Sequence, residues 1–150
     1  MRALIQRVVR AAVRVIDDSS AALTAGEIGP GLCVFVGVTH DDDESSARRL
    51  ADKVWNLRVF DDDEGVMNRA LSDGCGDVLV VSQFTLYADT SKGRRPSWVA
   101  AARPEVAEPL VDALVESLRG LGATVETGRF RTEMHVELVN DGPVTIAIET

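Results

Sequence analysis

The chain closes on the segment LVNDGPVTIAIET, in which two stretches of alternating apolar residues flank Asn140-Asp141-Gly142-Pro143. Alternation with a period of two is typical of a β-strand that buries one face. Glycine gives access to positive φ, and proline fixes φ and removes an N–H donor, so the tetrapeptide is expected to form a turn between two strands. A Gly-Pro bond also has a low cost for the cis isomer. Two interpretations follow: an ordinary turn, or a backbone segment shaped for a function.

Two other segments have the spacing of amphipathic helices. The first lies in 40–57, begins with acidic residues, and has Asp43 as a suitable N-cap. The second is PEVAEPLVDALVESLRGLG, where Pro109 is expected near the first turn and Gly120 or Gly122 at the end. Its apolar face is predicted to consist of Val106, Leu110, Leu114 and Leu118.

The remaining apolar segments favour strands. A turn at Arg10-Ala11-Ala12 is expected to divide the segment 3–16 into two strands, although a helix is an alternative there. At least six strands with two helices predict a mixed α/β (α+β) fold, a single domain over 1–150 with a mostly antiparallel sheet. Further strands are expected at 32–38, 77–88, 123–128, 134–139 and 144–150, with turns or loops at 25–31, 60–68 and 89–98.

Composition and charge narrow the classes of function. The net charge of −8 argues against a protein that coats nucleic acid, but it leaves room for a local basic patch that binds one end of a nucleic acid. Cys33 and Cys75 are not clustered, which predicts a reducing cytoplasm, with no metal-binding spacing and no disulfide framework. The acidic runs 41–44 and 61–64 lack a calcium-loop pattern and are expected to be solvated. No apolar run is long enough to cross a membrane, and no secretory signal is recognisable.

The segment SQFTLYADTSKGRRPSW, residues 82–98, combines polar groups at the end of an apolar strand with a basic loop. This combination suits a substrate that carries a reactive carbonyl and phosphates. The competing interpretation is a strand that turns polar at the surface before a solvated loop. If the strand alternates, one face carries Gln83, Thr85 and Tyr87, and the other carries Ser82, Phe84 and Leu86. The loop that follows contains Lys92, Arg94 and Arg95.

A side-chain nucleophile has little support in this sequence. Ser82 or Thr85 would need an adjacent base, and the two histidines lie in an acidic run (His40) and in a predicted strand (His135). Backbone N–H groups near Phe84 and Thr85 remain candidates for stabilising an oxyanion.

The segments SQFTLYADTSKGRRPSW and NDGPVT, in that order, closely resemble those of the bacterial and eukaryotic D-aminoacyl-tRNA deacylases. The similarity extends to MRALIQRVVRAAVRV, IGPGL, LRVFDDDEGVMN and AARPEVAEPLVDAL. It implies a cytoplasmic homodimer of mixed α/β subunits, with sheets packed at the interface and two active sites there. The implied reaction is hydrolysis of the ester between a D-amino acid and the 3′-terminal ribose of tRNA, and also of glycyl-tRNA mischarged on tRNA-Ala.

The resemblance implies no metal, no cofactor, and no DNA or membrane partner. It also assigns roles to individual residues. Gly142 and Pro143 match a Gly-cis-Pro element that reaches into the partner subunit's site and rejects L-aminoacyl groups by steric clash. Met134 is placed with these two as substrate-binding. The family is thought to use the ribose hydroxyl of the substrate itself, so the protein supplies positioning and oxyanion donors. The catalytic strand is matched by Ser82, Gln83, Phe84 and Thr85, and the tRNA contacts are expected from Lys92, Arg94 and Arg95.

Two positions depart from the family's pattern. Trp98 stands where Phe is common, and Arg131-Thr132 stands where Gly-Ala is frequent, in a segment expected to line the adenosine pocket. Two rival functions stay open. One is a tRNA-end or nucleic-acid binding protein without catalysis, marked by salt-dependent binding. The other is a hydrolase of a different small ester that requires no RNA.

Overall fold

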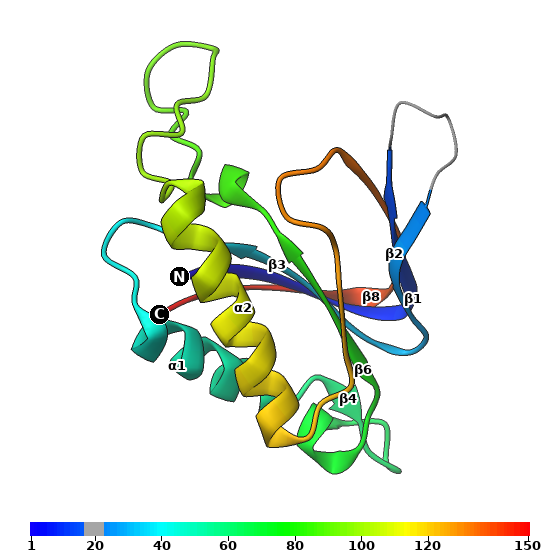
Figure 1. Cartoon of the computed structure of the whole chain (residues 1–150). Helices are drawn as coiled ribbons and strands as arrows, with labels where there is room; N and C mark the ends of the chain where they lie inside the picture. The colour runs from blue at the N-terminus through cyan, green and yellow to red at the C-terminus, as the bar shows by residue number, and fades with distance from the viewer. Residues whose placement is uncertain (17–22) are drawn as a thin grey trace.

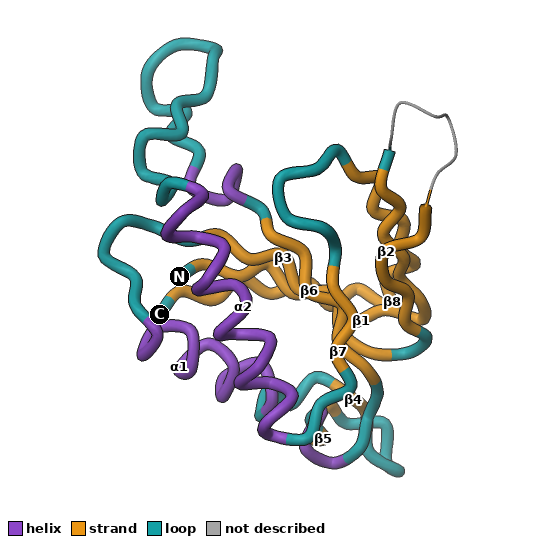
Figure 2. Tube along the Cα trace, viewed as in Figure 1, coloured by secondary structure: helices purple, strands orange, loops and turns teal. Residues whose placement is uncertain are grey.

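The computed structural model describes residues 1–16 and 23–150. Its two helices lie together on one side of a twisted sheet, and the two ends of the chain lie side by side (Figure 1). Figure 2 shows the same arrangement by type of element. The elements in chain order are β1 (Arg2–Val15), β2 (Leu23–Ile28), β3 (Gly31–Gly37), α1 (Glu44–Trp55), β4 (Phe60–Asp61), β5 (Met67–Arg69), the 3-10 turn η1 (Leu71–Asp73), β6 (Asp77–Ser82), the 3-10 turn η2 (Phe84–Tyr87), α2 (Pro104–Leu121), β7 (Val125–Thr127) and β8 (Met134–Glu149).

The main sheet is mixed and is organised around β1. The order is β2-β1-β3-β6-β7, and β8 pairs with β1 along its other side. The pairs that involve β1 are antiparallel, whereas β3–β6 and β6–β7 are parallel. This agrees with the mixed α/β class expected from the sequence.

The core has two parts because β3 is buried on both faces. Val34 packs towards the helices, where it meets Leu50 of α1 and Leu114 of α2. Cys33 points to the opposite face and packs with Leu79 and other apolar residues of β1 and β6. A strand covered on both faces reads as a continuous apolar run rather than an alternating one, as LCVFVGV does. Burial of each such leucine contributes roughly 1.5–3 kcal/mol.

The helix boundaries follow the capping signals, with two corrections. Asp43 is confirmed as the N-cap of α1, because its side chain accepts a hydrogen bond from the Ser46 N–H at 2.8 Å. Gly122, in the left-handed region at φ 108°, ends α2. Pro109 lies in the second turn, not near the first, because α2 begins at Pro104. On the predicted apolar face Val106 is exposed, whereas Leu110, Leu114 and Leu118 are buried together with Val111 and Val115.

The predicted turn at Arg10-Ala11-Ala12 is wrong. β1 is one continuous strand, and Ala11 pairs with Ile28 of β2 on one side and with Leu138 of β8 on the other. Irregularities in the pairing bend the strand without reversing it. Small side chains at this position leave space for neighbours on both sides, a requirement that local turn propensity does not reveal.

The turn predicted at 140–143 is also absent, because β8 continues through it. β8 pairs with β1 on both sides of this segment: Val8 lies opposite Asn140, and Gln6 lies opposite Thr145. The extra residues on β8 therefore form a wide bulge, and the chain keeps its direction. The peptide bond between Gly142 and Pro143 is cis. The prediction of an ordinary turn is wrong, and the alternative, a backbone segment shaped for a function, stays a prediction.

Three other boundaries differ from the sequence predictions. Residues 25–28, expected in a turn, belong to β2, and the expected loop 60–68 contains the β4–β5 hairpin. Of the segment 123–128, only Val125–Thr127 forms a strand. The strand predicted at 77–88 stops at Ser82. This last difference matters most for function.

Candidate functional site

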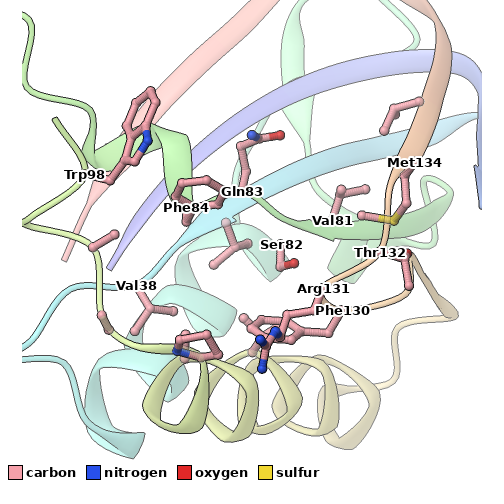
Figure 3. A pocket seen from close by; sticks show the side chains of 17 residues that line it. Val38, Val81, Ser82, Gln83, Phe84, Trp98, Phe130, Arg131, Thr132 and Met134 are labelled. Carbon is pink, nitrogen blue, oxygen red and sulfur yellow. The ribbon is translucent and has the colours of Figure 1, made fainter. Parts of the chain in front are cut away.

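A cavity of about 520 Å³ lies beside the predicted catalytic residues, between β6, the beginning of α2 and the connection from β7 to β8. A cavity of this volume suits a small ligand. Its walls are largely apolar (Figure 3). The predicted site residues Ser82, Gln83, Phe84 and Met134 line it, together with Phe130, Arg131 and Thr132.

The strand alternation predicted for 82–87 is wrong, because the chain turns into η2 after Gln83. The Gln83 N–H donates to the Val36 carbonyl at 2.7 Å, which extends the β3–β6 pairing by one bond. The Leu86 N–H then donates to the Gln83 carbonyl and closes a tight turn. As a result Phe84 is exposed and Tyr87 is buried, an arrangement that a strand pattern does not give.

Two features of β1 and β3 hold this turn in place. Gly37 leaves space for it, since a Cβ at this position would lie 3.1 Å from Leu86 Cβ and from Tyr87 Cδ2. The Arg2 guanidinium donates to the Leu86 carbonyl at 3.2 Å and lies over the Tyr87 ring at 4.5 Å. Burial, with a smaller effect of the Asp42 carboxylate, raises the pKa of Tyr87 to about 12. Tyr87 is therefore a packing residue with a neutral hydroxyl.

Thr85 does not line the cavity itself. Its hydroxyl accepts a hydrogen bond from the Gln83 side-chain amide. Gln83 itself lines the cavity, so Thr85 is placed to orient the Gln83 side chain. The structure thus brings three of the four predicted catalytic residues to the cavity and places the fourth in contact with one of them.

The basic loop lies at the mouth of the cavity but contributes only its end. Trp98 lines the cavity and meets Phe84 edge to face, with 5.7 Å between ring centroids. The Asp89 and Ser97 backbones exchange hydrogen bonds, and the Val99 carbonyl contacts His40 Nε2 at 2.7 Å. The loop is therefore anchored at its base. Its predicted tRNA contacts Lys92, Arg94 and Arg95 are exposed and lie outside the cavity lining.

The connection from β7 to β8 supplies the opposite wall. Phe130 in this wall was missed as a site residue, since a single aromatic residue in a connection gives no periodic signal. Arg131 has φ 57°, in the left-handed region. Thr132 Oγ1 donates to the Arg129 carbonyl at 3.0 Å, which closes the turn. The cavity lining, within the described residues, contains no His, Lys, Asp or Glu, so its side chains offer no ordinary general base.

The bulge at Gly142-Pro143 is far from this cavity within one subunit. Met134 lines the cavity, and the eight residues of β8 from there to Gly142 span roughly 26 Å at a strand rise of about 3.3 Å. The predicted substrate-binding residues Gly142 and Pro143 are exposed. The structure therefore does not bring them together with Met134 and the catalytic wall in the same subunit.

Buried side chains nevertheless fix the shape of the bulge. Arg7, only 9% exposed, donates from Nε to the Asp141 carbonyl at 3.1 Å and from Nη1 to the Val59 carbonyl at 2.6 Å. Its ion pair with the Asp141 carboxylate measures 3.0 Å. Asn140 Nδ2 donates to the carbonyls of Arg7 and Val144, each at 3.0 Å.

In residues 1–16 and 23–150, no group of three or more His, Cys, Asp or Glu residues is arranged to hold a metal ion. Neither helix there is long and apolar enough to cross a membrane.

Comparisons with known proteins bear on this site. The family described as D-Tyr-tRNA(Tyr) deacylase matches residues 4–149. A D-aminoacyl-tRNA deacylase of Symbiobacterium thermophilum is 57% identical over 150 residues, covering 100% of this chain and 96% of the relative. One of Mycolicibacterium smegmatis is 57% identical over 152 residues, covering 99% of each.

Two solved structures have the same fold. One, named c-Myc DNA unwinding element binding protein, has a TM-score of 0.90 and 35% identity, covering 100% of this chain and 99% of the other. The other, described as a probable eukaryotic D-amino acid tRNA deacylase, has a TM-score of 0.80 and 16% identity, covering 98% and 97%. At that identity the second likeness concerns the fold alone.

Proposed function

The chain belongs to the D-Tyr-tRNA(Tyr) deacylase family, and on this premise we propose how its site selects and hydrolyses D-aminoacyl-tRNA. It is a hydrolase that acts on the ester bond of D-aminoacyl-tRNA and releases a free D-amino acid and tRNA. The observation that carries the finer proposal is the separation between the two parts of the predicted site. The cavity is lined by Ser82, Gln83 and Phe84, whereas the exposed bulge at Gly142-Pro143 lies outside its lining.

The chemistry proposed for the cavity is substrate-assisted. Since the described lining offers no general base, the neighbouring hydroxyl of the terminal ribose takes part in place of a protein side chain. The first N–H groups of a 3-10 turn have no partner within the turn, so those of Phe84 and Thr85 are suited to an oxyanion. Gln83, oriented by Thr85, polarises or positions the ester carbonyl. An aminoacyl ester is activated, so this modest machinery suffices.

The selection of the D-enantiomer is assigned to the bulge of a second subunit. Backbone carbonyls at Gly142-Pro143 would fix the substrate's amino group and leave no space for an L side chain. Glycine has no side chain to clash, so glycyl-tRNA mischarged on tRNA-Ala is expected to be hydrolysed as well. Arg7 and Asn140 keep the carbonyls in position.

The homodimer that this scheme requires is supported by β8. Away from β1, β8 pairs with no described strand, so an edge of 16 residues remains open. Long open edges are covered in folded proteins, because their unpaired backbone groups promote association. We infer that a second copy covers this part of the sheet and inserts its bulge into the cavity. Sedimentation at assay concentrations should show a dimer, and a monomer that retains D-selectivity would contradict the scheme.

The basic loop is proposed to guide the tRNA 3′ end to the cavity. Residues 89–103 contain Lys92, Arg94, Arg95 and Arg103 against a single acid, Asp89, in a chain of net charge −8. Such a local patch attracts phosphates while the rest of the surface repels them. Charged tRNA is a cytoplasmic substrate, so a cytoplasmic location accompanies this proposal.

A second candidate, nucleic-acid binding without hydrolysis, is favoured by the same patch and by the name of the solved structure described as a DNA-unwinding-element binding protein. Salt-dependent binding of RNA or DNA with no ester turnover would support it. A hydrolase of free amino-acid esters is the third possibility. Turnover of D-tyrosine methyl ester comparable with that of the tRNA ester would favour that reading, because the methyl ester lacks the ribose hydroxyl.

The deciding experiment follows ester loss from D-tyrosyl-tRNA and L-tyrosyl-tRNA at catalytic protein concentrations. Rapid loss of the D form alone is expected. The Gly142→Ala variant should then lose D-turnover or D/L discrimination, because the new Cβ would collide with the Asn140 side-chain oxygen and displace the bulge. Gly120→Ala is the matched control, since its Cβ would have no neighbour within 4 Å. Unchanged discrimination in Gly142→Ala would contradict the bulge as selector.

A further inference from the structure

Arg131 combines an unfavourable backbone conformation with an exposed position at the edge of the cavity lining. Its φ of 57° is a region that L-residues other than Gly, Asn and Asp seldom adopt. No feature of the turn requires arginine there, because glycine would adopt the same backbone at lower cost. Residues held in such conformations concentrate at functional sites. The side chain therefore needs its own explanation.

The surroundings of Arg131 are apolar. It is the single charged residue among the described residues that line the cavity. Figure 3 shows Arg131 beside Phe130 near α2, with Trp98 farther away, next to Phe84. No carboxylate within the described ranges lies within 4 Å of its guanidinium, whereas Arg7, Arg14 and Arg119 have such partners. Among the described residues, this exposed cation at a largely apolar cavity therefore has no carboxylate partner and is available to an anionic ligand.

The substrate of the proposed function carries one anionic group next to its terminal nucleoside. This group is the phosphate that joins the 3′-terminal nucleotide to the nucleotide before it. A guanidinium binds phosphate through two parallel hydrogen bonds, which fixes orientation as well as affinity. Phe130, next to Arg131, offers an aromatic face for the terminal base, since bases of single-stranded ends stack on aromatic side chains.

We propose that Arg131 binds the phosphate on the 5′ side of the terminal nucleotide and so sets the depth to which the aminoacylated end enters the cavity. This inference rests on the proposed function. It assigns Arg131 a role separate from that of Lys92, Arg94 and Arg95, which lie outside the cavity lining and meet phosphates further along the strand. Arg131 thus distinguishes a nucleotide from a nucleoside, because only the nucleotide carries the phosphate.

Equilibrium binding tests this without depending on turnover. The probes are adenosine and adenosine 5′-monophosphate, titrated calorimetrically into the purified protein. The wild-type protein should prefer the monophosphate by roughly 10- to 100-fold, the usual size for a charge-assisted pair. In Arg131→Gln the preference should fall to near one. Arg129→Gln is the matched control, because Arg129 lines a neighbouring hollow, and its preference should stay as in the wild type.

A second variant separates binding from folding. Arg131→Gly should raise the thermal midpoint, because glycine relieves the left-handed conformation, and it should lose the phosphate preference at the same time. A preference that survives in both Arg131 variants, or is lost equally in Arg129→Gln, would overturn the proposal. So would a wild-type protein that binds the two probes equally.

The failure of this inference can be distinguished from failure of the proposed function. Hydrolysis of D-tyrosyl-tRNA by the wild type, with no phosphate preference, would overturn the role of Arg131 alone. Absence of hydrolysis with a preference that depends on Arg131 would keep the phosphate site and remove the proposed reaction.

Discussion

The two parts of the site, the wall at 82–85 and the bulge at 140–144, are held in opposite ways. The wall is attached by its backbone: Gln83 continues the pairing with β3, and Gly37 allows the turn to pack closely. The bulge has lost its backbone pairing with β1 and depends on two side chains, Arg7 and Asn140. The wall is therefore sensitive to added atoms, whereas the bulge is sensitive also to the loss of the side chains that support it.

This difference corresponds to two tasks. A group that polarises a carbonyl must be rigid relative to the cavity in its own subunit, and strand pairing provides that rigidity. A group proposed to enter a neighbouring subunit must protrude, so its backbone cannot be paired at the same time. Side-chain hydrogen bonds from a buried arginine stiffen a protruding segment without flattening it.

The strongest test of the comparison is Arg7→Met. We expect the free energy of unfolding to fall by about 2–3 kcal/mol, because charge-assisted hydrogen bonds to two carbonyls are lost at a buried position. The half-exposed carboxylates of Asp61 and Asp141 add little to this figure. Chemical denaturation measures the change, and the D/L ratio in deacylation should deteriorate in the folded protein.

Arg10→Met is the control for this variant, since Arg10 is exposed on the same strand. It should alter stability by no more than about 0.5 kcal/mol. Equal destabilisation by the two substitutions would mean that Arg7 has no special part in holding the bulge.

Gly37→Ala tests the wall with an intermediate effect. The new methyl group would lie 3.1–3.2 Å from Leu86, Tyr87 and the Gln83 carbonyl, so the turn must move by a few tenths of an ångström. We expect a stability loss of about 1 kcal/mol. Turnover should fall by roughly tenfold, since misplaced positioning groups reduce rates steeply. Gly29→Ala, whose Cβ has no neighbour within 4 Å, should behave like the wild type.

Alkaline pH is expected to have the smallest effect. It should lower the stability of the fold through Cys33, which is buried beside the strand that leads into the wall. Burial raises the pKa of Cys33 from 9.0 to about 12, and Cys33 lies opposite Leu79 of β6, the strand that leads into the wall. The unfolded thiol ionises near pH 9 while the folded thiol stays protonated, so stability is full below pH 9 and is lost as pH rises towards 12. Thermal midpoints between pH 8 and 11 would measure this loss.

The Cys33→Ala variant should show a flatter decline between pH 9 and 10. Tyr87, whose pKa is also raised to about 12, continues the loss above pH 10 in both proteins. Cys75→Ala is the control because Cys75 is less buried. Identical slopes in all three proteins would show that thiol ionisation does not contribute.

The sequence predicted those elements whose signals are local. Asp43 caps α1 because its side chain reaches an N–H three residues on, and Gly122 ends α2 because the left-handed region favours glycine. The buried strand at β3 followed from its apolar run. Three of the expected catalytic residues, Ser82, Gln83 and Phe84, line the cavity. They are consecutive in the sequence, so the position of a single segment brings all three there.

The errors occurred where distant contacts determine the backbone. The 82–87 segment leaves strand geometry because Gly37 and Arg2, both far away in sequence, accommodate a turn. The segment at 140–143 has every mark of a turn, but pairing with β1 on both sides keeps it within a strand. Phe130 gave no periodic pattern, since a connection between strands is shaped by what it packs against, and Arg131 was noticed only through the resemblance to the family.

β8 carries both the cavity residue Met134 and the bulge at Gly142-Pro143, and its extended backbone therefore sets the distance between them. The distance between the two features is fixed by a count of residues, and each residue inserted or deleted would shift one feature by about 3.3 Å and reverse the faces of all side chains between them. Changes of length during evolution should therefore accumulate in the connections outside this strand. Between Met134 and Gly142, amino acids can be exchanged, but their number cannot drift.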